Sequence, residues 1–143
     1  KIKKIVVEKD EKENGIRKIL NFGHTFAHAY EASLGFSKRL NHGEAVILGI
    51  NSALNFSIKK HLLKKNDYVL ITNHINNLNL SFNLKTFFSL KHLEKILSFM
   101  LKDKKNNSKK INLILLKKIG HPIINKNYHK ENLRLFMRKE LSN

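Results

Sequence analysis

Two histidines four residues apart are the first feature of this sequence whose types and spacing could do chemistry. His24 and His28 stand at positions i and i+4, so on a helix both imidazoles project from the same face. Arg17 and Asn21 precede His24 by seven and three residues and would add a cation and an amide to that face. Glu13 would join them if the helix begins early enough. Such a face suits a small anionic ligand.

A third histidine opens the next apolar segment. His42 begins the run HGEAV, and an antiparallel return of the chain after the loop 35–41 would bring it near His24. Neutral imidazoles suit Zn²⁺, which in catalytic sites takes two or three histidines with a carboxylate and keeps one position open. Because no glutamate directly follows the first histidine, a zinc protease of the HExxH type is not supported.

Each of these features also has a simpler interpretation. An HxxxH pair occurs on many helices that bind nothing, and Glu44 would favour the positive end of a helix dipole. Arg17 would pair with Glu13 on a wet surface. Two details favour a site instead. Apolar neighbours imply a partly buried face, where unpaired polar groups are costly; they are Ile19, Leu20, Phe22 and Phe26. Gly23 costs about 1 kcal/mol inside a helix, which suggests a close approach to its backbone.

The elements that must position these side chains follow from the spacing of apolar residues. Residues 111–116 form the one good strand candidate, ended by Gly120 and Pro122. Residues 2–9 fit a strand or a helix equally well. Helices are predicted from Ile16 to about Ser33, from His42 to about Leu63, at 67–78, at 90–102 with Ser89 as N-cap, and from His129 to Leu141. We therefore expect a single, mainly α domain over residues 1–143, with at most a small β-hairpin near 111–124.

Composition excludes several function classes. The 143 residues contain no cysteine, so a disulfide scaffold, a thiolate nucleophile and a cysteine-ligated zinc are all excluded. No apolar run approaches the ~20 residues of a membrane span, and no signal peptide opens the chain. We expect no membrane partner and a cytoplasmic location, with which the lack of cysteine is compatible.

The net charge of +17 invites a nucleic-acid interpretation. Residues 13–56 hold four basic and three acidic residues, so +16 of the charge lies in the flanks. These flanks are rich in Lys, Asn and Ile, the residues that A/T-rich codons supply. The dense basic runs 59–65 and 102–110 contain no aromatic residue, unlike a typical nucleic-acid surface. A basic nucleic-acid-binding module is kept as the non-enzymatic alternative, and a solvated, compositionally biased surface is favoured.

The motif RKILNFGHTFAHA at 17–29, followed by HGEAV at 42–46, closely resembles the C-terminal helical, metal-binding domain of the 3-dehydroquinate synthase family. Residues 3–15 match the segment that precedes this motif in the family. The run MLKDKK at 100–105 and the run INLILLKKIG at 111–120 match a later block in the right order. The resemblance therefore extends from about residue 3 to about residue 120.

The resemblance implies an activity and a role for each motif residue. The family enzyme converts 3-deoxy-D-arabino-heptulosonate 7-phosphate to 3-dehydroquinate, a step of the shikimate pathway, with NAD and a divalent metal such as zinc or cobalt. Its substrate is a phosphorylated sugar acid. By resemblance His24 and His42 are metal ligands, His28 and Asn21 lie by the phosphate and assist proton transfer, Lys3 and Arg17 hold the carboxylate, Glu13 holds a hydroxyl, and Lys104 or Lys105 holds the phosphate. The resemblance thus replaces the interpretation of His24 and His28 as joint ligands.

The sequence departs from the family pattern in two ways. Ala27 stands where the family usually has glycine. The family's N-terminal α/β half, which binds NAD and supplies a glutamate as third metal ligand, is absent, and no G-x-G-x-x-G turn occurs. We therefore expect these 143 residues alone to be inactive, as a fragment, a split chain or a decayed remnant, and the full-length enzyme to be a homodimer.

Two enzymatic alternatives stay open. One is another sugar-phosphate cyclase, which makes an inosose or a valiolone and shares the three motif histidines. The other is an iron-type polyol dehydrogenase, from which Glu13, Arg17, Asn21 and the Asp-Lys-Lys block at 103–105 point away.

Overall fold

The computed structural model describes residues 2–80, 82–102 and 110–142. These form a mainly helical domain with one antiparallel hairpin, as the sequence predicts. In chain order the elements are α1 (Ile2–Lys9), the 3₁₀ helix η1 (Ile16–Asn21), α2 (His24–Ser33), α3 (His42–Lys59), α4 (Lys65–Asn77), α5 (Leu84–Phe87), the 3₁₀ helix η2 (Leu90–His92), α6 (Leu93–Lys102), β1 (Lys110–Lys118), β2 (His121–His129) and α7 (Lys130–Ser142). None of the described helices is long and apolar enough to span a membrane.

The predicted helix from Ile16 to Ser33 is wrong in one respect, because the structure divides it into η1 and α2. Gly23 has φ +82°, in the left-handed region that breaks a right-handed helix and favours glycine. Arg17 and Asn21 therefore do not share a helix face with His24 and with the following residues of α2. Glu13 does not extend this helix either, since it lies in the loop before η1 with φ +54°.

Gly23 also allows α2 and α3 to cross closely. The sequence predicts such a close approach, because a glycine is unfavourable inside a helix. A Cβ atom at Gly23 would lie 2.6 Å from the backbone nitrogen of Ile50, and one at Gly49 would lie 2.9 Å from the backbone nitrogen of Ala27. The fully buried Ala27 thus packs against a glycine on α3. The methyl group at this position is accommodated because the facing residue has no side chain.

A cluster of aromatic rings lies where α2, α3 and α7 meet. The ring of Phe136 on α7 packs edge to face on Phe26 at 6.2 Å and on Phe56 at 5.0 Å between centroids. Tyr30 is completely buried, and its hydroxyl lies 2.6 Å from the Ser52 hydroxyl. This contact joins α2 to α3 within the core and gives both buried hydroxyls a hydrogen-bond partner.

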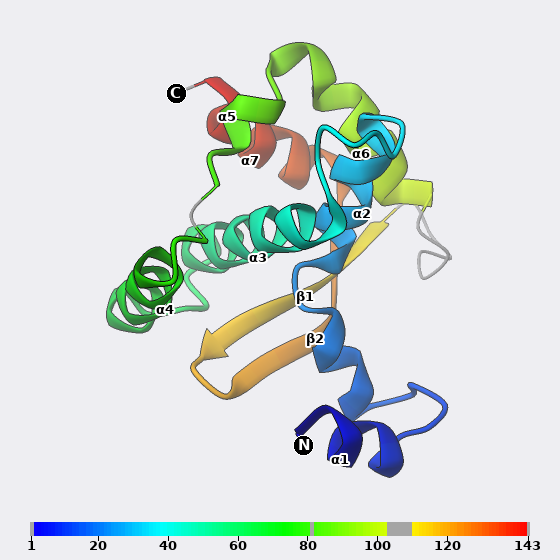
Figure 1. Cartoon of the computed structure of the whole chain (residues 1–143), viewed down its shortest axis with the longest axis vertical. Coiled ribbons are helices and arrows are strands. Elements are labelled where there is room, and N and C mark those ends of the chain that lie inside the picture. Colours follow the sequence, from blue (N-terminus) through cyan, green and yellow to red (C-terminus); the bar gives the residue numbers. More distant parts are fainter. Residues whose placement is uncertain (1, 81, 103–109, 143) are drawn as a thin grey trace.

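The hairpin covers this core through one face of β1. Its buried residues alternate with half-buried ones, as in a strand with one face on the core; they are Ile111, Leu113 and Leu115. The hairpin is longer than predicted, since β2 reaches His129. In Figure 1 the hairpin extends away from α5 and α7, and α1 lies at the far end of the molecule from them.

An exposed charge network joins α6 to α7 beside their buried apolar residues. Glu94 on α6 accepts hydrogen bonds from Arg134 Nε at 2.7 Å and from Lys130 Nζ at 3.0 Å. These bonds lower the pKa of Glu94 to about 2, mainly through Arg134.

A carboxylate whose pKa is depressed stabilises the fold above its unfolded pKa and loses this effect as pH falls toward its folded pKa. We expect the difference in unfolding free energy between the unsubstituted protein and Glu94→Gln to shrink as pH falls from about 4.5 to about 2. Urea unfolding at several pH values measures this. Glu8→Gln, which removes only the exposed pair with Lys4 at 3.7 Å, is the control. A difference that does not change with pH would contradict the role of the network.

Candidate metal centre and adjoining pocket

Three histidine rings converge near the start of α2. The centroid of the His24 ring lies 5.6 Å from that of His28 and 6.1 Å from that of His42. The two neighbours reach His24 by different routes, one from the next turn of the same helix and the other from the first residue of α3. The chain therefore brings His42 back near His24, as the sequence predicts, but α2 and α3 cross each other at Gly23 and Gly49 and do not lie side by side (Figure 1).

The start of α3 fixes the backbone of His42. Asn41 is the N-cap, and its side chain accepts a hydrogen bond from the Glu44 backbone N–H at 2.9 Å. Glu44 completes the capping box, because its carboxylate accepts from the Asn41 backbone N–H, also at 2.9 Å. His42 Nδ1 lies 3.0 Å from Oε1 of Glu31 on α2.

His24 is half-buried, with its Nδ1 3.4 Å from the Phe22 carbonyl oxygen. Partial burial is the main cause that lowers the pKa of His24, and the carbonyl opposes this effect. The ring is consequently neutral at pH 7. A neutral imidazole is the form that binds a metal ion.

The two rings fit a divalent metal in their donor chemistry. In each ring Nδ1 faces an oxygen atom, of a carboxylate for His42 and of a backbone carbonyl for His24, which leaves Nε2 to coordinate. Within residues 2–80, 82–102 and 110–142 no group of three or more His, Cys, Asp or Glu side chains is placed to hold an ion. A metal ion held by His24 and His42 would therefore need further ligands from outside these described residues or from solvent.

A cavity of about 380 Å³ adjoins His24. It lies between α1, the loop before η1, η1 and the start of α2, and it gathers most of the side chains that the sequence singled out. Its lining residues are Lys3, Val7, Glu13, Arg17, Leu20, Asn21 and His24. Two cations, a carboxylate and an amide therefore line a cavity that also borders the His24 ring of the cluster. Lys104 and Lys105 lie outside the described residues.

Hydrogen bonds order this cavity from within. Asn21 Nδ2 donates to Glu13 Oε1 at 2.5 Å, so the amide of η1 holds the carboxylate of the preceding loop. Arg17 does not pair with Glu13 in the way that the simpler interpretation suggests. Its Nη1 donates to the Glu11 backbone carbonyl at 2.6 Å instead.

Asp10 shapes the loop that carries Glu13. Its carboxylate accepts backbone N–H bonds from Asn14 at 3.0 Å, Gly15 at 2.8 Å and Arg17 at 2.9 Å. These bonds, chiefly those from Arg17 and Gly15, lower the pKa of Asp10 below its usual range. The residue spacing around Asp10 does not predict this role, because its three donors lie four, five and seven residues further along the chain.

A second, largely apolar cavity of about 690 Å³ borders the cluster from the other side. His24 and His42 form its polar end, and its apolar wall consists of Val46, Ile47, Leu80 and Phe82. His24 lines both cavities and therefore stands at their junction, whereas His42 lines the apolar one alone.

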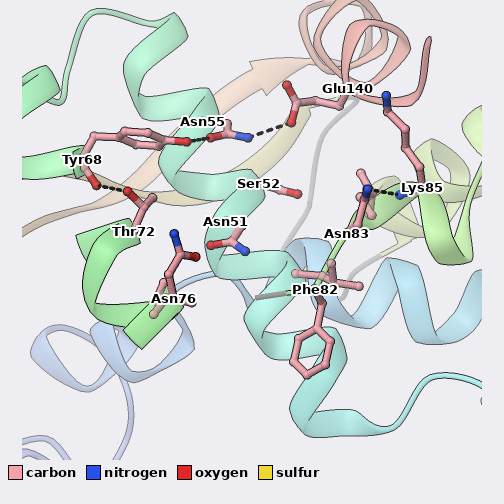
Figure 2. A pocket seen from close by; sticks show the side chains of 13 residues that line it. Asn51, Ser52, Asn55, Tyr68, Thr72, Asn76, Phe82, Asn83, Lys85 and Glu140 are labelled. Carbon is pink, nitrogen blue, oxygen red and sulfur yellow. Dashed lines mark hydrogen bonds between the residues drawn. The ribbon is translucent and has the colours of Figure 1, made fainter. Parts of the chain in front are cut away.

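A third cavity, of about 540 Å³, lies between α3, α4 and the residues before α5 and contains no predicted site residue. Figure 2 shows its polar wall, in which the Tyr68 hydroxyl donates to Asn55 and Asn55 donates to Glu140, each bond at 2.8 Å. The two hydrogen bonds link Tyr68, Asn55 and Glu140 in series along this wall.

Comparison with known proteins agrees with the geometry. Residues 1–106 match the family described as 3-dehydroquinate synthase C-terminal. The chain is 57% identical over 141 residues to the 3-dehydroquinate synthase of Pelagibacter ubique. This alignment covers 99% of this chain and 38% of that relative. It is 42% identical over 120 residues to the enzyme of the same name from Campylobacter hominis, covering 84% of this chain and 33% of the relative.

Two solved structures share the fold. A 2-deoxy-scyllo-inosose synthase, crystallised with carbaglucose-6-phosphate, NAD⁺ and Co²⁺, is 21% identical with a TM-score of 0.78 over 96% of this chain and 38% of its own. A 2-epi-5-epi-valiolone synthase from Streptomyces hygroscopicus, with NAD⁺ and Zn²⁺ bound, is 16% identical with a TM-score of 0.74 over 95% of this chain and 36% of its own. The chain spans 38% and 33% of the length of these two curated relatives. On the family match over residues 1–106, the chain belongs to the 3-dehydroquinate synthase C-terminal family.

Proposed function

We propose that this chain forms the metal- and substrate-binding part of a 3-dehydroquinate synthase, a lyase that converts 3-deoxy-D-arabino-heptulosonate 7-phosphate to 3-dehydroquinate and phosphate. The observation that carries the proposal is the cavity in which Lys3, Arg17, Glu13 and Asn21 surround His24. Its two cations suit the carboxylate of a phosphorylated sugar acid. Its carboxylate and amide suit the substrate hydroxyls.

His24 and His42 would hold a divalent metal, zinc or cobalt, through their Nε2 atoms. When bound, such an ion polarises a hydroxyl or carbonyl oxygen and so favours the loss of a hydride or a proton nearby. The NAD⁺ that takes the hydride would be bound by sequence other than these 143 residues. The neighbours solved with NAD⁺ and with Co²⁺ or Zn²⁺ support this cofactor pair.

The remaining polar residues would act directly on the substrate. Arg17 and Lys3 neutralise its carboxylate, and Glu13, held by Asn21, accepts a hydrogen bond from a hydroxyl. Elimination of phosphate breaks a C–O bond, whose electron pair leaves with phosphate, and removes a proton from the adjacent carbon. His28, exposed one turn from His24, would take part in moving that proton.

Turnover measurements test the proposal. The protein, expressed as its gene encodes it, is expected to release phosphate and 3-dehydroquinate in equal amounts, in the presence of zinc and catalytic NAD⁺. The isolated 143-residue chain is expected to show no turnover. Conversion of another sugar phosphate to an inosose or a valiolone instead would favour an inosose or valiolone synthase. NAD-dependent oxidation of a simple polyol without phosphate release would favour a polyol dehydrogenase, and a steeply salt-dependent shift of DNA or RNA without turnover would favour a nucleic-acid module.

Arg17→Ala is expected to lower kcat/KM for the phosphorylated sugar acid by about 10- to 100-fold, since a hydrogen bond to a charged group contributes roughly 1.5–3 kcal/mol. Lys18→Ala is the control, because Lys18 is the adjacent cation and does not line the cavity. Steady-state kinetics of both variants measure the effect. Equal losses in the two variants would show a general charge effect and contradict the assignment of Arg17.

A further inference from the structure

Glu31 on α2 is a carboxylate placed against the ring of His42. It follows His24 by seven residues and His28 by three, so it continues the histidine face of the helix. Its Oε1 lies 3.0 Å from His42 Nδ1. Only 13% of the Glu31 side chain is exposed, whereas 63% of the His42 side chain is. The carboxylate is thus the fixed partner and the imidazole the accessible one.

This contact determines which way the His42 ring faces. A carboxylate accepts hydrogen bonds and donates none, so His42 Nδ1 is the donor and Nε2 keeps its lone pair. The capping box at Asn41 and Glu44 fixes the backbone of His42 but does not touch its ring. In an imidazole that is two-thirds exposed, no other hydrogen bond within the described part of the chain holds the ring nitrogens in one orientation.

We infer that Glu31 is a positioning residue, which acts through His42 to present Nε2 to the metal ion. The inference rests on the metal centre of the proposed function. Carboxylate partners of metal-binding histidines fix the tautomer and raise the basicity of the ligand, and their loss typically lowers metal affinity 10- to 100-fold. A merely structural role, as a tie between α2 and α3, would leave metal affinity unchanged, so the two roles are separable.

Zinc affinity tests the inference in the protein expressed as its gene encodes it, by competition with a chromophoric chelator. Glu31→Ala is expected to weaken zinc binding by about 10- to 100-fold. Glu31→Gln is expected to lose less, because the amide oxygen still accepts from Nδ1. Glu44→Gln is the matched control: it removes the same charge two residues from His42, keeps a residue that completes a capping box, and is expected to change affinity less than about 3-fold.

The tautomer of His42 gives a second readout that needs no metal. Long-range ¹⁵N–¹H correlation spectra of the zinc-free protein are expected to show the Nδ1–H form, and those of Glu31→Ala a shift toward the Nε2–H form. Circular dichroism in chelator shows whether the variants remain folded. Equal zinc affinity in Glu31→Ala and Glu44→Gln, with an unchanged tautomer, would overturn the role of Glu31 and leave the metal centre itself standing. Failure of the unsubstituted protein to bind zinc would overturn the metal centre and this inference with it.

Discussion

Replacing His42 by alanine is expected to lower zinc affinity by more than the ~100-fold that loss of an outer partner costs, and to abolish turnover with it. The reason is that, within the cluster of three rings, His42 and His24 each have an Nδ1 atom that faces an oxygen and an Nε2 atom that is left to coordinate. Equilibrium dialysis against ⁶⁵Zn or a chelator competition measures the affinity, and release of phosphate measures turnover.

His28→Ala is the matched control, because its ring also lies near His24, at 5.6 Å between centroids. This variant is expected to keep zinc affinity within a few-fold of the unsubstituted protein and to lose turnover, as a residue that moves protons would. If His28→Ala lost zinc and His42→Ala kept it, the i, i+4 pair on α2 would be the ligand pair after all.

Gly23→Ala is expected to destabilise the fold by about 3 kcal/mol or more. Two costs add at this position. A non-glycine residue in the left-handed region costs roughly 1–2 kcal/mol, and Gly23 has φ +82°. A Cβ here would also lie 2.6 Å from the backbone nitrogen of Ile50, and overpacking of this kind typically costs about 1–3 kcal/mol. Urea unfolding followed by circular dichroism measures the change.

Gly35→Ala separates the two costs. Gly35 has φ +65° but nothing within 4 Å of the added Cβ, so only the backbone cost of about 1–2 kcal/mol applies. The difference between the two variants therefore reports the close crossing of α2 and α3. Equal destabilisation of both would mean that the crossing contributes nothing.

The helices around the histidines were predicted well from the sequence, because the signals that define them lie within a few neighbouring residues. The 3.6-residue spacing of apolar side chains locates α3, and the Asn41–Glu44 pair marks its start. The same spacing ran through Gly23 without interruption, so it joined η1 and α2 into one helix. Gly23 also lies against the backbone of α3 at Gly49, which is 26 residues further along the chain. A local pattern carries no record of that contact.

The cavity beside His24 also could not be predicted from local sequence patterns. A single helix face was the wrong reason for expecting Glu13, Arg17 and Asn21 together, and Lys3 was chosen by resemblance alone. They meet because α1, a carboxylate-ordered loop and η1 fold back on the start of α2. The contact between Glu31 and the His42 ring could be predicted only in part. The sequence shows that Glu31 lies on the same face of α2 as His24 and His28, but only the position of α3 brings His42 to it.

X-ray absorption at the zinc edge of the protein, expressed as its gene encodes it, tests the metal centre most directly. The predicted spectrum contains two imidazole ligands with Zn–N distances of about 2.0–2.1 Å, completed by oxygen. It should be unchanged in His28→Ala and should fall to one imidazole in His42→Ala. A shell without imidazole, or one that loses an imidazole in His28→Ala and not in His42→Ala, would contradict the assignment of His24 and His42 as the metal ligands.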